Sequence, residues 1–421
     1  MKNLLRRAKY LIRRFYKVAI VAICIIAICV GYANTQGKTQ ANIPAQKVQP
    51  KLIQFGWGVP TPTFVKQNIQ EMEKRPFDGM VMKLSVGKQV FLHKPYAPQK
   101  FTEDLASLQS TKFTKFTDNF VVMWATTEEG WDWFNESDWQ AAEQNIRLFA
   151  KAARAGKLAG ILFDPEPYGE NPWIYPKQPS AKEKSFAEYS QQVRQRGSQF
   201  MQALQQELPG VKVLALFQLS YLHRLLDESD PQERRRKLST HQYGLLAPFL
   251  NGMLDAASPN TRISDGNERS YYYTNSQSFF ESYKLIKEKV LIFVDPENRS
   301  KYNLQVQVGQ ALYIDQLLAL RKPPEELLSY HLTPEERAKW LEHNTYYALS
   351  TTDEYVWCYS EEMNWWKNQV PDGAEEALQS ARKKIDSGNP LGFNIEAMLQ
   401  KARLMQKVQK MTHTSTDIDK R

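Results

Sequence analysis

Two carboxylates one residue apart end an apolar stretch near the middle of the chain. Residues 160–163 (GILF) are small or apolar, and Asp164, Glu166 and Tyr168 follow them. This pattern is typical of a buried strand that ends at an open face. Neighbouring carboxyl groups can act as proton donor and charged partner, so acid and base chemistry is the first hypothesis for this stretch.

Acids and aromatic residues follow the other predicted strands as well. Cleavage of a glycosidic bond requires a protonated carboxylic acid at the leaving oxygen and a carboxylate beside the oxocarbenium-like transition state, while sugar rings stack on indoles. The combination therefore predicts a polysaccharide or oligosaccharide as substrate. The candidate catalytic residues are Glu166, Asp164, Asp265, Glu268 and Glu361, and the candidate substrate-binding residues are Trp57, Trp124, Tyr168, Tyr221, Asn364 and Trp365.

Glu166 is the predicted general acid and Asp164 its tuning partner, with Glu361 or Asp265 as the opposing carboxylate. The three tyrosines at 271–273 are interpreted as wall of the same site. Each residue also has a purely structural interpretation. Carboxylates at strand ends often cap the next helix or pair with arginine, and a tryptophan is more often packing than ligand contact.

The alternative to an enzyme is a non-catalytic glycan-binding or exopolysaccharide-associated envelope protein. Carboxylates that face each other across an open cleft favour the enzyme, whereas buried or salt-bridged carboxylates favour the binder. A third hypothesis, a single divalent ion at Asp164 and Glu166, requires at least three ligands around one point. The six histidines are scattered without an H-E-x-x-H motif, so no metal site is assigned and no cofactor is expected.

Short apolar runs alternate with helical patterns from residue 51 to about residue 360. Eight such runs fit a (β/α)8 TIM barrel with enlarged loops, in which the carboxyl ends of all strands meet at one rim. A doubly wound open sheet is the competitor, but no glycine-rich phosphate loop follows the first run. The predicted strands are residues 51–59, 77–84, 117–125, 158–164, 211–219, 261–268, 303–314 and 354–360.

Several local predictions accompany this fold. Residues 303–314 are preferred over 289–295 as the seventh strand, because 276–293 can form one amphipathic helix. A long helix begins at Ser180, and residues 227–237 (DESDPQERRRK) form a charged surface loop. Another helix has Thr333 as N-cap and Pro334 in its first turn. A C-terminal helical extension contains helices at 374–386 and about 394–411.

The first 33 residues carry a separate signal. Seven cations and no acid precede residue 18, and an uninterrupted apolar run, residues 18–30, follows them. This arrangement predicts either a cleaved signal peptide or a short membrane anchor within residues 18–33, so the body acts outside the cytoplasm, secreted, periplasmic or anchored to the inner membrane. Subtracting these seven charges from the formal +9 leaves the rest with +2, which argues against a nucleic-acid partner.

The predicted domain organisation has four parts. Residues 1–33 are the signal peptide or anchor, and 34–50, which are polar and contain prolines, are a flexible tether. Residues 51–370 form the barrel, and 371–421 form the C-terminal helices and a polar tail.

The segment F-D-P-E-P-Y-G around Asp164 and Glu166 resembles the fourth-strand signature of chitinase-like family 18 glycoside hydrolases. The resemblance implies that Glu166 is the acid and that Asp164 orients an acetamido group of the substrate. The family also has aspartates two and five residues before this aspartate, where this chain has Leu162 and Ala159. The resemblance therefore covers about ten residues.

A second, looser resemblance is to large glycoside-hydrolase-type barrel proteins of bacterial envelopes. It is carried by M-E-K-R-P-F-D-G at 72–79, D-G-x-E at 265–268 and Y-V-W-x-Y-S-E at 355–361. It implies the barrel fold and the broad class of protein.

Overall fold

The computed structural model describes residues 49–418, and the described chain from Pro50 onward packs as one compact unit. The predicted signal peptide or anchor at 1–33, and the tether as far as residue 48, lie outside the described residues. Among the helices of the described part, none combines the length and the apolar character needed to cross a membrane.

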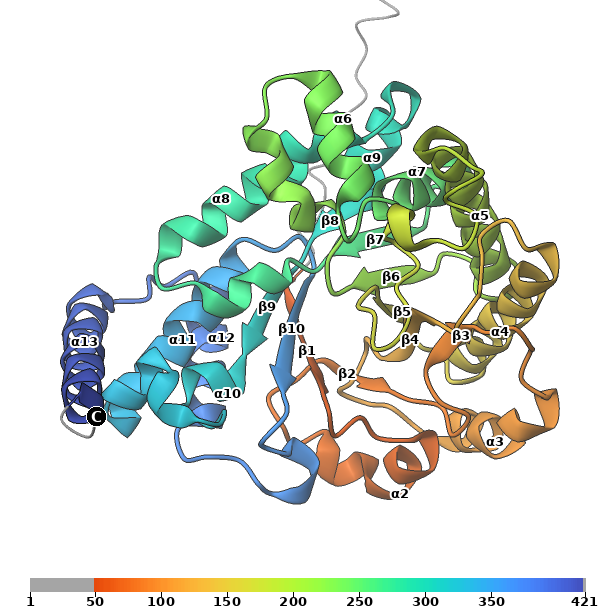
Figure 1. The fold of residues 1–421 in the computed structure, drawn as a ribbon. Helices are drawn as coiled ribbons and strands as arrows, with labels where there is room; N and C mark the ends of the chain where they lie inside the picture. The colour runs from red at the N-terminus through yellow and green to blue at the C-terminus, as the bar shows by residue number, and fades with distance from the viewer. Residues whose placement is uncertain (1–48, 419–421) are drawn as a thin grey trace, which may run out of the picture. The chain divides into compact units, whose positions relative to one another are not determined.

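Parallel strands form a nearly closed barrel whose strands alternate with helices, as predicted (Figure 1). Each strand is buried on both faces, which explains its almost continuous apolar sequence. The barrel strands, in chain order, are β1 (Lys51–Gly56), β2 (Gly79–Met82), β4 (Phe120–Thr127), β5 (Gly160–Asp164), β6 (Lys212–Ala215), β7 (Arg262–Asp265), β8 (Val306–Val308), β9 (Gln310–Tyr313) and β10 (Tyr355–Ser360).

The strands β8 and β9 occupy one place in the barrel, because only Gly309 separates them. β8 pairs with β7 and β9 pairs with β10, while the Gly309 N–H donates to the Asp265 carbonyl at 2.8 Å. A Cβ at Gly309 would lie 2.9 Å from the Cα of Gly266, so this crossing requires a residue without a side chain. The prediction of a seventh strand within 303–314 is confirmed.

Helices surround the barrel (Figure 1). The N-cap Thr333 and Pro334 of α11 are confirmed, with a capping box formed by Thr333 and Glu336. The helices are α2 (Pro62–Met72), α3 (Thr102–Ser110), α4 (Glu136–Ala155), α5 (Phe186–Glu207), α6 (Pro231–Thr240), α7 (Leu246–Ala256), α8 (Ser276–Lys287), α9 (Arg299–Gln305), α10 (Ile314–Leu317), α11 (Pro334–Ser350), α12 (Ala374–Asp386) and α13 (Glu396–Ile418).

Two local predictions are wrong. The long helix begins at Phe186 and not at Ser180, because Ser185 and Glu188 form a capping box that fixes the start there. The charged stretch 227–237 is not a loop throughout, since its second half starts helix α6. Asp230 accepts the Gln232 N–H and Pro231 stands in the first turn, so the charges cover a solvated helix. The short strand β3 (Gln89–Phe91), which pairs with β4, was not predicted.

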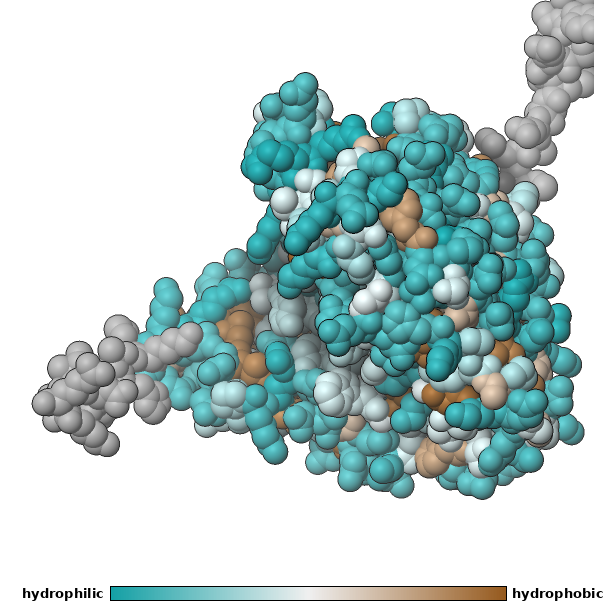
Figure 2. All heavy atoms as spheres, turned by 45° about the vertical axis from the view of Figure 1, so that its right-hand side comes forward, coloured by the Kyte–Doolittle hydropathy of each residue, from teal (hydrophilic) through white to brown (hydrophobic). Residues whose placement is uncertain are grey.

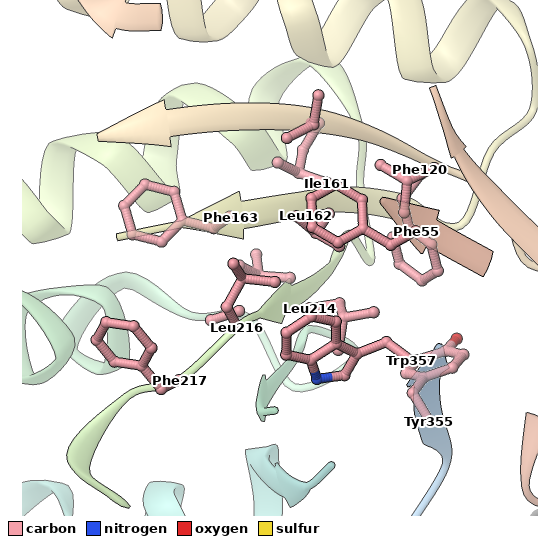
Figure 3. Packing of buried hydrophobic residues seen from close by; sticks show 14 of the residues in the cluster. Phe55, Phe120, Ile161, Leu162, Phe163, Leu214, Leu216, Phe217, Tyr355 and Trp357 are labelled. Carbon is pink, nitrogen blue, oxygen red and sulfur yellow. The ribbon is translucent and has the colours of Figure 1, made fainter. Parts of the chain in front are cut away.

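Large side chains fill the barrel interior (Figure 3). Phe120 meets Tyr355 edge-on with ring centroids 5.3 Å apart, and Phe55 lies 6.0 Å from Trp357. Most of the face shown in Figure 2 is hydrophilic, with small hydrophobic patches between. The barrel is thus a packed core, and the space for a ligand lies at its rim.

Charged groups cover the barrel at the amino ends of its strands. The buried carboxylate of Asp118 accepts the ammonium of Lys51, the hydroxyl of Tyr355 at 2.5 Å and the ammonium of Lys212 at 3.3 Å. These contacts outweigh the opposite effect of burial and lower the pKa of Asp118 to about 2. Asp118 thereby joins strands that are far apart in the sequence.

Helix α12 attaches the C-terminal extension to the barrel. Its Arg382 donates to the carbonyl of Pro50 and to the carboxylate of Asp78, while Lys384 pairs with Glu342 of α11 at 2.7 Å. The extension therefore packs at the amino end of β1, away from the carboxyl ends of the strands.

Candidate active site

The end of β5 holds the predicted carboxylate pair in a fixed loop. Asp164 is the last residue of the strand and is fully buried, and its Oδ1 accepts the Glu166 N–H at 2.9 Å. The Tyr168 hydroxyl lies 3.0 Å from Asp164 Oδ2 and 2.7 Å from Glu166 Oε2. Thr126 at the end of β4 accepts the Tyr168 N–H at 2.9 Å. One tyrosine thus connects the two carboxyl groups.

Burial controls the protonation of Asp164. Loss of solvent around the carboxyl group, followed by repulsion from Glu166, raises its pKa to about 8. Hydrogen bonds from the Glu166 N–H and from Tyr168 act in the opposite direction but are weaker. Asp164 therefore carries a proton at neutral pH.

A cation and an aromatic pair line the side of the site next to Asp164. The rings of Trp124 and Tyr168 lie 4.4 Å apart, and Lys88 Nζ lies 3.8 Å from the centroid of the Trp124 ring. Burial, and after it the charge of Lys83, lowers the pKa of Lys88 to about 8, while Asp164 acts to raise it. Lys88 precedes strand β3.

Glu361 follows β10 and is held by two hydroxyl groups and a cation. Its Oε1 accepts the Tyr313 hydroxyl and lies 3.4 Å from Arg321 Nε, and its Oε2 accepts the Tyr359 hydroxyl at 3.3 Å. The Glu361 backbone N–H donates to Asp315 at 2.8 Å, which fixes the loop after the strand.

Glu268 opens the short helical turn Glu268–Tyr272 that follows β7. Burial, and then the charges of Glu166 and Asp164, raise the pKa of Glu268. Within the described chain, its carboxyl group has neither an ion pair nor a hydrogen bond. It is a partly buried acid that no cation of the described chain neutralises.

A single pocket of about 330 Å³ brings these groups together at the carboxyl ends of the strands. Trp57, Tyr168 and Tyr272 are exposed by 72%, 52% and 59%, so aromatic faces are accessible to a ligand. The pocket is lined by Phe55, Gly56, Trp57, Lys88, Trp124, Asp164, Glu166, Tyr168, Leu216, Glu268, Tyr271, Tyr272, Tyr313, Arg321, Tyr359 and Glu361.

Most of the predicted site residues meet in this pocket. Its lining includes the candidate catalytic acids Glu166, Asp164, Glu268 and Glu361 and the candidate binding residues Trp57, Trp124 and Tyr168. Two of the three tyrosines interpreted as wall, Tyr271 and Tyr272, also line it.

Asp265 does not reach the pocket. It is fully buried, its Oδ2 accepts the Ser220 N–H at 2.8 Å and its Oδ1 accepts the Ser220 hydroxyl at 2.5 Å. These bonds tie the segment after β6 to the end of β7. The prediction of Asp265 as an opposing carboxylate is not supported, because both of its carboxylate oxygens accept hydrogen bonds from Ser220.

Three predicted ligand contacts also lie elsewhere. Tyr221 does not line the pocket and packs between Phe217 and Tyr243, with ring centroids 4.4 and 4.7 Å away. Asn364 accepts the Trp366 N–H at 2.9 Å and so caps the turn Trp365–Lys367. Trp365 is buried and meets Phe77 edge-on at 4.9 Å. For this tryptophan the packing interpretation is correct.

Sequence reasoning missed Lys88, Arg321 and Tyr359 among the lining residues. Lys88 belongs to a loop before a strand that was not predicted, and Arg321 belongs to the loop after α10, eight residues beyond the end of β9. Tyr359 lies inside the predicted eighth strand, where alternation of side chains across the barrel wall could have pointed to it.

The described residues contain no group of three or more histidine, cysteine, aspartate or glutamate side chains arranged to hold a metal ion. The cationic side chains that line the pocket are those of Lys88 and Arg321.

No protein-family profile and no curated protein sequence matches the chain. Solved structures with a similar course of the chain include glycoside hydrolases of families 5 and 18. A GH5-4 broad specificity endoglucanase from Clostridum cellulovorans has 10% identity, a TM-score of 0.43 and coverage of 77% of this chain and 88% of that one. A GH18 chitinase from Pseudoalteromonas aurantia has 10% identity, a TM-score of 0.37 and coverage of 79% and 99%.

A Bacteroidetes-affiliated GH5 cellulase linked with a polysaccharide utilization locus has 11% identity, a TM-score of 0.42 and coverage of 82% of this chain and 90% of that one.

Proposed function

We propose that the protein is a glycoside hydrolase-like enzyme that cleaves a polysaccharide or oligosaccharide by carboxylate acid and base chemistry in this pocket. The observation that carries the proposal is the contact of one hydroxyl, that of Tyr168, with the carboxyl oxygens of both Asp164 and Glu166. Accessible aromatic faces beside these acids suit the stacking of sugar rings.

The tyrosine can pass a proton between the two acids. A hydroxyl has one hydrogen, so Tyr168 donates to one carboxyl group and accepts from the other when that group is protonated. Asp164 is protonated at neutral pH, since its pKa is raised to about 8. When Glu166 gives its proton to the glycosidic oxygen, the proton of Asp164 moves to Tyr168 as the tyrosine proton moves to Glu166.

Glu361 is the proposed opposing carboxylate. Arg321 and the hydroxyls of Tyr313 and Tyr359 hold its carboxyl group in place, and a carboxylate in this role stabilises an oxocarbenium-like transition state. A carboxylate supplied by the protein requires no acetamido group on the substrate, so this role differs from the substrate-assisted mechanism that the chitinase-like signature implies.

A non-catalytic glycan-binding protein is the second candidate. The ion pair of Glu361 with Arg321 favours it, because a carboxylate held by a cation is a weaker base and nucleophile. The two candidates predict the same ligands but different products.

The test is a screen of polysaccharides in which binding and release of reducing ends are scored separately. The wild-type protein, Glu166→Gln and the control Glu362→Gln are compared; Glu362 is exposed on the same rim outside the pocket. The enzyme proposal expects reducing-end release by wild type and by the control, and its loss with retained binding in Glu166→Gln. Binding without release by wild type supports the binding protein instead.

We also propose that the protein acts outside the cytoplasm. The support is the sequence alone, with seven cations before an apolar run at 18–30. We expect that protease added to cells with a permeabilised outer membrane degrades the barrel. Protection equal to that of a cytoplasmic marker contradicts the export proposal.

A further inference from the structure

We propose that the substrate carries a free amino group, and that the pocket selects this amino sugar by pairing the ammonium group with Glu268. The inference rests on the proposed function and names its substrate class.

The charges of the pocket leave Glu268 without a partner. Arg321 is an ion-pair partner of Glu361 at 3.4 Å. Asp164 and Glu166 both contact the Tyr168 hydroxyl, at 3.0 and 2.7 Å. Of the four acids that line the pocket, Glu268 is therefore the one whose carboxyl group has no hydrogen bond or ion pair within the described residues.

The proposed reaction does not need this fourth acid. Proton donation is assigned to Glu166 with Asp164 behind it, and the opposing charge to Glu361. The charged form of a carboxyl group that is partly withdrawn from water is costly unless a cation compensates it. A neutral sugar leaves Glu268 dependent on a bound proton, whereas an ammonium group stabilises the charged carboxylate.

The surroundings of Glu268 suit an ammonium group on a sugar ring. Tyr271 and Tyr272 follow Glu268 on the same turn, and Tyr272 is largely exposed in the pocket wall. An ammonium group beside an aromatic face gains attraction from the ring electrons, and the ring of the sugar can stack on the same walls. The pocket thus offers one carboxylate and aromatic surface together.

In the empty pocket a proton takes the place of the ligand cation. Burial and the neighbouring acids raise the pKa of Glu268, so the empty site holds a proton there at neutral pH. An ammonium group replaces this proton, and binding releases it to the solvent. Glu268 has Coulombic interactions with the ionisable groups of Asp164, Glu166, Tyr221, Tyr243, Tyr271 and Tyr272.

The experiment measures binding by calorimetry with oligomers of equal length, namely glucosamine, N-acetylglucosamine and cellulose oligomers. The Glu166→Gln protein is used so that no ligand is cleaved, at about pH 6, where a sugar amine is charged. We expect the glucosamine oligomer to bind about tenfold more tightly than its N-acetylated form, with release of close to one proton. Adding Glu268→Gln is expected to reduce the affinity ratio to about one, while adding Glu362→Gln preserves it.

Equal affinity for the amine and N-acetyl forms overturns the inference, as does a preference that survives Glu268→Gln. This result is separable from the proposed function, which is judged by reducing-end release from the wild-type protein. Cleavage of neutral glycans without amine selectivity leaves the enzyme proposal intact and refutes the ammonium site. Amine-selective binding without cleavage supports the ammonium site and refutes the enzyme.

Discussion

Replacement of Tyr168 by phenylalanine removes the one oxygen that connects Asp164 and Glu166, at 3.0 and 2.7 Å. A hydrogen bond to a charged group contributes about 1.5–3 kcal/mol, which corresponds to a rate factor of about 10 to 100. The phenylalanine ring keeps the stacking on Trp124, and the side chain is half exposed, so the fold is expected to remain intact. We therefore expect kcat to fall by about 10- to 100-fold while KM changes less than about threefold.

The assay is steady-state hydrolysis of the best glycan from the screen, measured across pH. Because the hydrogen bond from Tyr168 lowers the pKa of Asp164, its loss raises that pKa and moves the alkaline limb of the kcat profile to higher pH. A tyrosine with only a packing role would change KM and leave the limb in place. A kcat within about twofold of wild type, in a protein that Glu166→Gln inactivates, refutes the proton transfer through Tyr168.

Three further predictions concern other parts of the structure. Wild-type activity should fall as pH rises through about 8, because Asp164 then loses the proton it supplies; constant activity up to about pH 10 contradicts this role. Trp57→Ala should raise KM about three- to tenfold with little change in unfolding free energy, since the side chain is exposed in the pocket wall; an unchanged KM in the same assay excludes stacking there. Asp118→Asn should lower the unfolding free energy by about 2 kcal/mol at neutral pH, because the folded pKa of about 2 lies below the unfolded value of 3.8. This contribution is present above pH 3.8 and is lost as pH falls through about 2. Denaturant titrations in which Asp118→Asn lowers the unfolding free energy equally at neutral pH and at about pH 2 contradict it.

The barrel was predictable because its strands are short apolar runs that end in polar residues, and because those ends share one rim in a parallel barrel. Asp164, Glu268 and Glu361 could be brought together in this way without knowledge of side-chain directions. The helix at 231–240 was not recognised, because its charges gave no apolar periodicity and only Asp230 and Pro231 marked its start.

The sequence could not show which acids line the pocket and which form hydrogen bonds inside the protein. Asp265 and Glu268 are three residues apart in the sequence. The carboxylate of Asp265 accepts two hydrogen bonds from Ser220, whereas Glu268 lines the pocket. Alternation along β7 does not decide this, because the chain leaves the strand after Asp265 and Asn267 takes a left-handed conformation with φ of 44°. Arg321 and Lys88 come from loops, whose positions depend on tertiary packing that local sequence does not encode.

The role of Glu166 as proton donor is tested most directly with two substrates that differ only in the leaving group. One is a natural glycan whose leaving oxygen requires a proton, and the other is a dinitrophenyl glycoside of the same sugar, whose leaving group departs without one. We expect Glu166→Gln to lose about 100-fold or more in kcat/KM on the glycan and less than about tenfold on the dinitrophenyl glycoside. Equal losses on both substrates, or full activity on the glycan, would contradict the assignment of Glu166 as the general acid.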